Sequence, residues 1–216
     1  MPARFQKIDD QNRGDHYHLT DDDECYFLYE YTSGQNYQFS TTNSLISNLK
    51  KKPSLAATPQ YRYKRQALQT CAAAFGEAIN AQWLASATLV PVPPSKARAD
   101  PEYDDRMLQI CRSIPTAGFT ADVRELVTQI VSLPAAHEGQ RPTIDELLAV
   151  YQIDEAQAQP APQRIGIVDD VLTAGTHYCA MKSTLQARFP GVPVVGFFIV
   201  RRVFANPFDD VEDCQL

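Results

Sequence analysis

Short apolar runs alternate with amphipathic stretches along most of the chain. Runs rich in β-branched and aromatic residues predict strands at 25–31, 87–92, 122–127, 165–168 and 192–203. Apolar residues spaced three and four apart predict helices at 61–84, 103–112 and 143–151, and a further helix after residue 176. This order is typical of an α/β fold with a central, mainly parallel sheet flanked by helices.

Residues 1–60 follow a different pattern. Cys25–Tyr31 and Tyr37–Phe39 are separated by residues with turn chemistry, which predicts a β-hairpin. Residues 42–49 are typical of a short helix, and the segment 53–59 begins and ends with proline and interrupts regular structure. We therefore expect an N-terminal extension over residues 1–60 and a core domain over residues 61–216.

The stretch 164–176 combines a predicted buried strand with polar residues suited to ligand binding. Asp169 and Asp170 follow the strand, and a turn of small residues at 173–176 leads into a helix. The amides of such a turn and the positive end of the helix favour a phosphate, and Gly175 allows the backbone to approach it closely. The two carboxylates can accept hydrogen bonds from sugar hydroxyls, or hold Mg²⁺ directly or through water.

A second candidate loop follows the predicted strand at 87–92. The sequence Pro93-Pro94-Ser95-Lys96 stops the strand and places Lys96 at its carboxyl end, where open α/β sheets bind ligands. On its own, this sequence is more typical of a surface turn with a solvated lysine. Opposite an acidic pair on another strand, it predicts a site in which the lysine loop holds pyrophosphate and the acidic pair holds a sugar.

The segment before the last predicted helices is polar. Residues 132–142 are interrupted by proline and glycine, which predicts a mobile loop, and Thr143 is expected to form a capping box with Glu146. At 103–112, Asp104 is the predicted N-cap. We interpret Asp105 and Arg106 as a local surface ion pair.

Composition limits the functional classes. The chain has 216 residues, of which 44% are hydrophobic, so it is long enough for one α/β domain with an appendage. Its net charge of −6 disfavours a general nucleic-acid binder, and the run Lys50–Lys52 is interpreted as a solvated helix end. No apolar run approaches the roughly 18–20 residues of a membrane span, and residues 1–14 are polar, so we expect a cytoplasmic protein.

The cysteines and histidines give no metal or disulfide pattern. The cysteines lack CxxC spacing and are expected to be free thiols. They are Cys25, Cys71, Cys111, Cys179 and Cys214. The acidic run 21–24 is the only group of possible metal ligands near His16 and His18 in the sequence. We therefore interpret the two histidines as part of a solvated loop rather than a metal site.

The motifs together resemble a known family. Residues 167–176 resemble the signature by which type I phosphoribosyltransferases bind 5-phosphoribosyl 1-pyrophosphate (PRPP), and residues 89–96 look like the first core strand and pyrophosphate loop of that family. Residues 126–153 are similar to the flexible loop and following helix of its ComF-type branch. Gly166 and His177 depart from the family pattern, and the resemblance covers about residues 87–202.

The resemblance implies a fold and a set of roles. The fold would be that of a type I phosphoribosyltransferase, in which the hairpin at 25–39 is a candidate for the variable hood. Asp169 and Asp170 would bind the ribose 2′- and 3′-hydroxyls, and Mg²⁺ would be the cofactor. The 5′-phosphate would be held by Thr173, Ala174, Gly175, Thr176 and His177.

The remaining roles concern the leaving group. Ser95 and Lys96 would contact the pyrophosphate, and Arg141 would close over the site to neutralise it. The expected catalytic set is Asp169, Asp170, Lys96 and Arg141. Arg201 and Arg202 either reach this site or lie at the edge of the sheet.

Three functions are compatible with these residues. The first is a phosphoribosyltransferase that uses PRPP and Mg²⁺, transfers ribose 5-phosphate to a nitrogen nucleophile and releases pyrophosphate. The second is a non-catalytic protein that senses PRPP or a nucleotide, together with a protein partner or as a homodimer. The third is an α/β domain in which the acidic pair only caps a turn. No membrane or nucleic-acid partner is expected, and no residue selects the acceptor.

Overall fold

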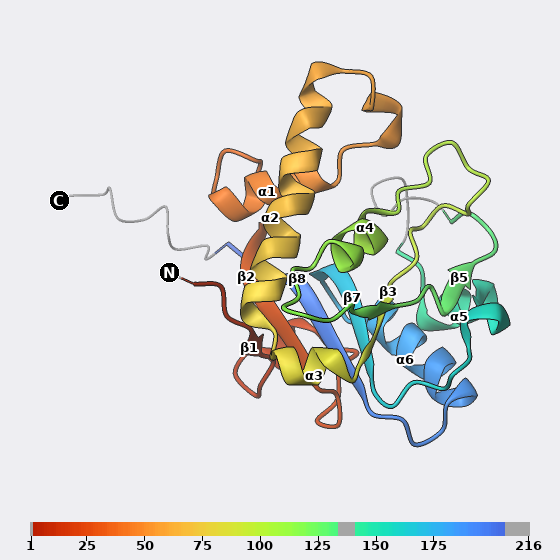
Figure 1. Ribbon diagram of the computed structural model, residues 1–216. Coiled ribbons are helices and arrows are strands. Elements are labelled where there is room, and N and C mark those ends of the chain that lie inside the picture. Colours follow the sequence, from red (N-terminus) through yellow and green to blue (C-terminus); the bar gives the residue numbers. More distant parts are fainter. Residues whose placement is uncertain (1, 134–140, 206–216) are drawn as a thin grey trace.

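The computed structural model describes residues 2–133 and 141–205. A six-stranded sheet has the order β1-β2-β8-β7-β3-β4, and all neighbours in it are parallel except β1 and β2 (Figure 1). The strands are β1 (Gln6–Lys7), β2 (Cys25–Ser33), β3 (Thr88–Pro91), β4 (Asp122–Val123), β7 (Ile165–Leu172) and β8 (Val194–Phe204). The predicted α/β class with a mainly parallel sheet is therefore confirmed.

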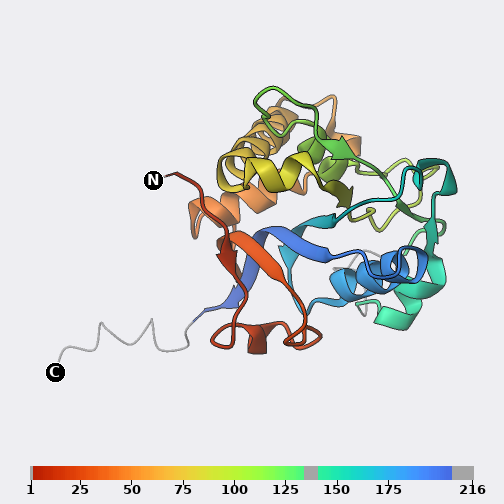
Figure 2. The same ribbon diagram turned by 60° about the horizontal axis from the view of Figure 1, so that its bottom comes forward.

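Helices cover both faces of this sheet (Figure 2). Helices α1 (Thr41–Leu49), α2 (Arg62–Ala78), α3 (Ala81–Ala85) and α4 (Arg106–Arg112) contribute to the apolar cluster on one face. Helices α5 (Ile144–Val150) and α6 (Thr176–Arg188) contribute to the cluster on the other face, beside the antiparallel pair β5 (Val127–Gln129) and β6 (Tyr151–Ile153). Short 3₁₀ turns lie at 13–15, 53–55, 59–61 and 155–157.

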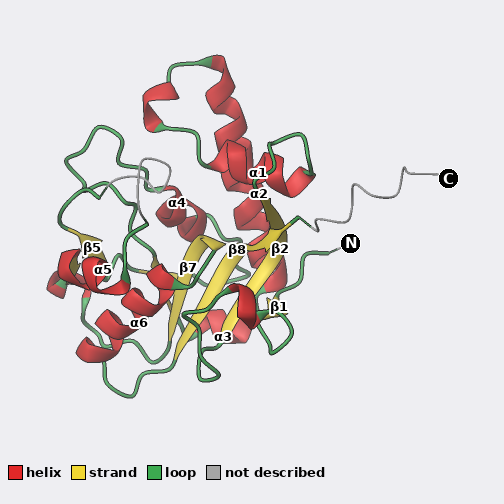
Figure 3. Cartoon of the chain, turned by 180° about the vertical axis from the view of Figure 1, so that it is seen from behind, coloured by secondary structure: helices red, strands yellow, loops and turns green. Residues whose placement is uncertain are grey.

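The predicted N-terminal hairpin is wrong. Strand β2 lies between β1 and β8 and pairs in parallel with β8, from Cys25 beside Gly196 to Ser33 beside Phe204 (Figure 3). Tyr37 and Phe39 lie in a turn and are 59% and 53% exposed. The aromatic run forms an inner strand of the main sheet, because its side chains pack into the apolar clusters on both faces of that sheet.

Two other elements differ from the pattern predicted by sequence, and one predicted cap is present. The helix expected at 61–84 divides into α2 and α3 because the backbone is extended at Ile79 and the Asn80 side chain caps α3, accepting from Trp83 N at 3.0 Å. The strand expected at 122–127 divides into β4 and β5, which belong to different sheets. The capping box of Thr143 and Glu146 is confirmed.

Strand β7 packs closely enough that one position requires glycine. A Cβ atom on Gly166 would lie 2.9 Å from Leu89 Cδ2 and 3.0 Å from the ring of Trp83. The space that a larger apolar side chain would take is therefore filled from β3 and α3.

Replacing Gly196 by Ala is expected to destabilise the fold by about 1–3 kcal/mol, the usual cost of overpacking a core. The added Cβ would lie 2.8 Å from Tyr178 Cε2 and 2.9 Å from Cys25 Sγ, between β8, α6 and β2. Urea unfolding measures the change. Gly14→Ala, where nothing lies within 4 Å, is the control; equal stability of both variants would contradict this packing.

Within the described residues, no helix is both long enough and apolar enough to cross a lipid bilayer. The thiols of Cys25, Cys71, Cys111 and Cys179 are free, as expected. Burial raises the pKa of Cys71 and of Cys111 to about 12, so these groups stay protonated at neutral pH. Cys214 lies outside the described residues.

Candidate functional site

The two candidate loops lie side by side at one edge of the sheet. Strands β3 and β7 are parallel neighbours, with Pro91 beside Val168 and a hydrogen bond from Val92 N to Val168 O of 2.9 Å. Figure 1 shows β3 beside β7, and the carboxyl ends of parallel neighbours meet at the same sheet edge. Residues 93–96 and the segment beginning at Asp169 therefore face the same region.

The acidic pair lies within β7, which continues to Leu172, rather than in a loop. Successive strand residues point to opposite faces. Asp169 lies near Tyr151 on the α5 and α6 side. Burial is the main cause that raises the pKa of the Tyr151 hydroxyl, and the charge of Asp169 raises it further. Asp170 points to the α1 and α4 side and is 5% exposed, and its N–H donates to Asp169 Oδ1 at 2.8 Å.

Arg106 holds Asp170 in one orientation. Its Nε and Nη2 both donate to Asp170 Oδ2, at 2.9 and 2.7 Å, and Lys50 Nζ lies 3.5 Å from the same oxygen. The interpretation of Arg106 as a surface ion pair with Asp105 is therefore wrong. The run at 50–52 is likewise not only a solvated helix end, since Lys50 reaches the acidic pair.

Arg106 also joins Asp170 to a buried ion pair. Its Nη1 donates to Asp104 Oδ2 at 2.8 Å, and Lys64 Nζ donates to the same oxygen at 2.6 Å. The Lys64 side chain is 1% exposed. The predicted Asp104 N-cap is wrong, because α4 begins at Arg106 with Asp105 at the cap position and no capping side chain. Asp104 is used in this network instead.

The sequence patterns did not identify Lys50, Lys64 and Arg106. For Lys64 a signal existed: it stands seven residues before Cys71, on the apolar stripe of α2. A lysine on a buried face requires an acidic partner. No local pattern names that partner, which is 40 residues away.

The two carboxylates have opposite pKa shifts. Burial opposes ionisation of Asp170, but Lys50 and Arg106 outweigh it and lower the pKa well below its usual range. Burial, followed by the negative charge of Asp170, raises the pKa of Asp169 to about 7. The site therefore holds one permanently ionised carboxylate beside one that exchanges a proton near neutral pH.

Replacing Asp169 by Asn is expected to change the pH dependence of stability. Because folding raises the pKa of Asp169, the folded state keeps a proton that the unfolded state loses between about pH 4 and 7. The stability of the wild type relative to the variant therefore falls as pH rises through this window, by at most about 1.4 kcal/mol per pH unit. Urea unfolding of both proteins measures the difference, and a constant difference would contradict the raised pKa.

The variant is the necessary reference in that measurement. Burial lowers the pKa of His177 to about 4, so the unfolded state binds a proton that the folded state lacks. This effect makes stability rise with pH in the same window and has the opposite sign. It is present in both proteins and cancels in the comparison.

The turn after β7 has the predicted form. Gly175 has φ of 94° and precedes the first residue of α6, Thr176. Ala174 is 4% exposed and Gly175 is also buried, whereas Thr173, Thr176 and His177 keep partial exposure. A Cβ atom on Gly175 would meet Leu19 Cδ2 at 2.9 Å, so both the backbone angle and the packing require glycine.

His177 is neutral and paired. Its Nδ1 lies 2.9 Å from the hydroxyl of Tyr151. A phenol donating to Nδ1 leaves the proton on Nε2. In this arrangement His177 offers a neutral N–H donor.

The lysine loop is held by the last residue of β5 and by the segment that follows it. Ser95 O accepts from Leu133 N at 2.8 Å and from Gln129 Nε2 at 2.6 Å. Ser95 and Lys96 are partly exposed, and the charge of Lys96 contributes to the lowered pKa of Asp100. Lys96 thus lies near Asp100, and no ion pair joins it to Asp169 or Asp170 among the described residues.

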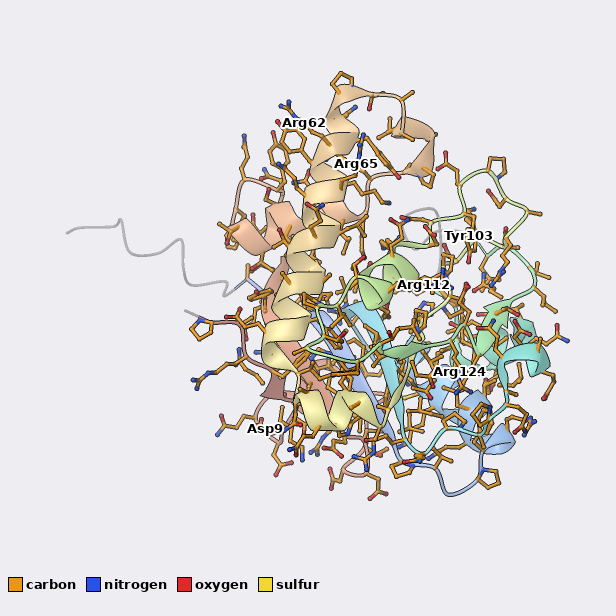
Figure 4. All side chains as sticks on the ribbon, viewed as in Figure 1. Asp9, Arg62, Arg65, Tyr103, Arg112 and Arg124 are labelled. Atoms are coloured by element: carbon orange, nitrogen blue, oxygen red, sulfur yellow. The ribbon has the colours of Figure 1, made fainter. Side chains whose placement is uncertain are left out.

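Shallow pockets lie beside this loop. Their walls include Pro93, Pro94, Tyr103 and Glu125. The hydroxyl of Tyr103, which Figure 4 labels, donates to Glu125 Oε1 at 3.3 Å. The acidic pair does not line them. These hollows therefore lie alongside the acidic pair and not over it.

The arginines at the sheet edge have different roles. Arg141 is exposed. Burial is the main cause that lowers the pKa of Arg202, and the charge of Arg141 is the second cause, so Arg141 lies near the end of β8. Arg201 pairs with Asp15 at 3.2 Å and Glu30 at 2.5 Å. Closure by Arg141 stays a prediction, since residues 134–140 lie outside the described part.

The residues fit Mg²⁺ only if a ligand shares it. Among residues 2–133 and 141–205, no cluster of three or more His, Cys, Asp or Glu side chains forms a metal site. His16, which was expected in a solvated loop, is buried instead. Partly exposed Asp169 can serve as one carboxylate ligand, which suits Mg²⁺ because it is commonly held by one or two carboxylates, water and substrate phosphates.

Comparison with models of known protein families and with curated proteins finds no match for this chain. The functional assignment therefore rests on the residues and geometry of the site.

Proposed function

We propose that this protein is a phosphoribosyltransferase that binds PRPP with Mg²⁺, transfers ribose 5-phosphate to a nitrogen nucleophile and releases pyrophosphate. The observation that supports this proposal is that the two predicted ligand loops follow β7 and β3, which are parallel neighbours. The loops at 93–96 and 173–176, which are far apart in the sequence, thus lie together at the carboxyl edge of the sheet.

The acidic pair suits a ribose. Arg106 and Lys50 occupy Asp170 Oδ2, and Oδ1 has no partner among the described residues. A carboxylate fixed in this way offers its free oxygen to a sugar hydroxyl without having to reorganise. Asp169, on the same strand, is partly exposed and supplies the second acceptor.

The loops suit the two charged groups of PRPP. The turn at 173–175 and the start of α6 offer amide and hydroxyl donors to the 5′-phosphate. Ser95 and Lys96 stand on the neighbouring loop for the pyrophosphate. Arg141 is proposed to approach when the pyrophosphate is bound.

The chemistry follows from these positions. The bond between ribose C1 and the pyrophosphate oxygen breaks, the electron pair leaves with pyrophosphate, and positive charge develops on the ribose. The carboxylates of Asp169 and Asp170 stabilise that charge. The nucleophile forms the new C–N bond and loses a proton, which Asp169 can accept because its pKa lies near 7. Bound with PRPP, Mg²⁺ neutralises charge on the leaving group.

Pyrophosphate release tests this proposal. The protein is incubated with PRPP, Mg²⁺ and a panel of nucleobases and simple amines, and calorimetry measures PRPP binding in parallel. Release that requires both Mg²⁺ and one acceptor is the expected result. A specific ligand is expected to bind with a dissociation constant below about 1 mM. Absence of PRPP binding at that concentration would overturn the proposal.

One observation favours a second candidate, a protein that senses PRPP or a nucleotide without turnover. Arg106 and Lys50 already neutralise Asp170, and Lys96 lies near Asp100. Both features reduce the charge available for catalysis and leave binding intact. PRPP binding without pyrophosphate release for any acceptor would support this candidate over the enzyme.

A further inference from the structure

The segment before β2 crosses the turn proposed to bind the 5′-phosphate. His16 Nδ1 contacts Thr173 O, and His18 N–H donates to Ala174 O at 3.0 Å. The thiol of Cys179 in α6 lies 3.3 Å from His18 O. Two successive carbonyl oxygens of the turn are thus held from the same side.

The same segment is fixed to the turn and to α6 by packing and charge. Leu19 is 7% exposed and lies against Gly175. Lys182 Nζ of α6 forms an ion pair with Asp23 Oδ1 at 2.6 Å, and the Asp23 side chain is 6% exposed. The segment from 16 to 23 and the first turns of α6 therefore form one packed unit.

His16 is a buried neutral histidine. Its side chain is inaccessible to solvent, and burial, the largest cause, lowers its pKa. Because Nδ1 faces a carbonyl oxygen, Nδ1 carries the proton. Nε2 is buried and has no partner among the described residues. Burying Nε2 without a partner costs stability, so the position of His16 requires another explanation.

Peptide geometry gives the consequence for the turn. In a planar trans peptide, the C=O of one residue and the N–H of the next point in opposite directions. Because Thr173 O and Ala174 O face the N-terminal segment, the amides of Ala174 and Gly175 point away from it. Those are the first two donors that the proposed phosphate site requires.

We infer that His16 is a positioning residue for the phosphate loop, and that residues 16–19 hold its carbonyls so that its amides face a phosphate monoester. The assignment of that monoester to ribose 5-phosphate rests on the proposed function. The N-terminal segment thereby contributes to ligand binding without touching the ligand.

Matched substitutions of His16 separate this role from general stability. The amide nitrogen of Asn occupies the position of Nδ1, whereas that of Gln reproduces Nε2, which donates to nothing here. His16→Asn is expected to keep the wild-type affinity for ribose 5-phosphate. His16→Gln and His16→Ala are expected to weaken it about tenfold, as for loss of one buried hydrogen bond. His18→Ala, which retains the backbone donor, is the control within the segment.

Two ligands and one ligand-free measurement make the test specific. Affinity for pyrophosphate, proposed to bind on the other loop, should not change in any variant. Amide hydrogen exchange of His18, whose N–H donates to Ala174 O, should accelerate in the free protein in His16→Gln and remain slow in His16→Asn. A parallel loss of ribose 5-phosphate and pyrophosphate affinity would indicate only lower stability and overturn the inference.

The remaining outcomes distinguish the inference from the proposed function. Unchanged exchange in His16→Gln would overturn the inference, even if the wild type binds PRPP. The wild type could bind neither PRPP nor ribose 5-phosphate while exchange still accelerates in His16→Gln. In that case His16 orders the loop. That result would remove both the proposed function and the phosphate role of the loop.

Discussion

Arg106→Met is expected to lower the free energy of unfolding by about 3 kcal/mol, the lower end of the range for breaking a buried ion pair. The substitution removes three hydrogen bonds that Arg106 donates, two to Asp170 Oδ2 and one to Asp104 Oδ2. Lys50 and Lys64 remain near these carboxylates, and the Arg106 side chain is 22% exposed, which limits the loss. Urea unfolding at about pH 7.5 measures the change.

A second substitution identifies the cause. If the cost comes from leaving Asp170 charged and less compensated, Arg106→Met combined with Asp170→Asn should be more stable than Arg106→Met alone. Arg188→Ala is the control, because its pair with Glu155 lies at the surface and should contribute at most about 1 kcal/mol. A single variant as stable as this control would contradict a structural role for the network.

The sequence predicted the parts of the fold that depend on local pattern. The strand at 165–168, the turn at Gly175 and the capping box at Thr143 follow from residues a few positions apart, and each is present. Strand β2 was recognised, but its partner was not. Its pairing with β8 joins residues about 170 positions apart, and hairpin chemistry at 32–36 favoured a nearer partner.

The candidate site shows the same limit. Asp169, Asp170 and the turn were identifiable because they are contiguous with one strand. The cations that act on Asp170 are the C-cap residue of α1 and the first residue of α4, and the contact that holds the turn comes from residue 16. Each is a single polar residue whose purpose depends on its tertiary neighbours, so no sequence period marks it. The sequence around His16 therefore indicates a solvated residue, although the structure buries it.

Asp169→Asn is expected to reduce the rate of pyrophosphate release by about a hundredfold, the usual loss for removing one charged group that stabilises a transition state. The variant loses the negative charge near ribose C1 and the group that accepts the proton from the nucleophile. Affinity for PRPP should fall much less, because the amide oxygen of Asn still accepts a hydrogen bond from a hydroxyl. Single-turnover measurements with the active acceptor separate the two effects.

Instability cannot produce this loss, because the substitution removes a charge that the fold disfavours. Burial raises the pKa of Asp169 to about 7, so above that pH the wild type holds an ionised group in an environment that opposes ionisation. Asn is neutral, and its side-chain oxygen can still accept from Asp170 N, so the variant should unfold at no lower temperature at about pH 8. Asp22→Asn, at an exposed carboxylate without a described side-chain partner, is the control for the chemical change. Equal rates for Asp169→Asn and Asp22→Asn, in a protein that releases pyrophosphate, would place the chemistry elsewhere in the molecule.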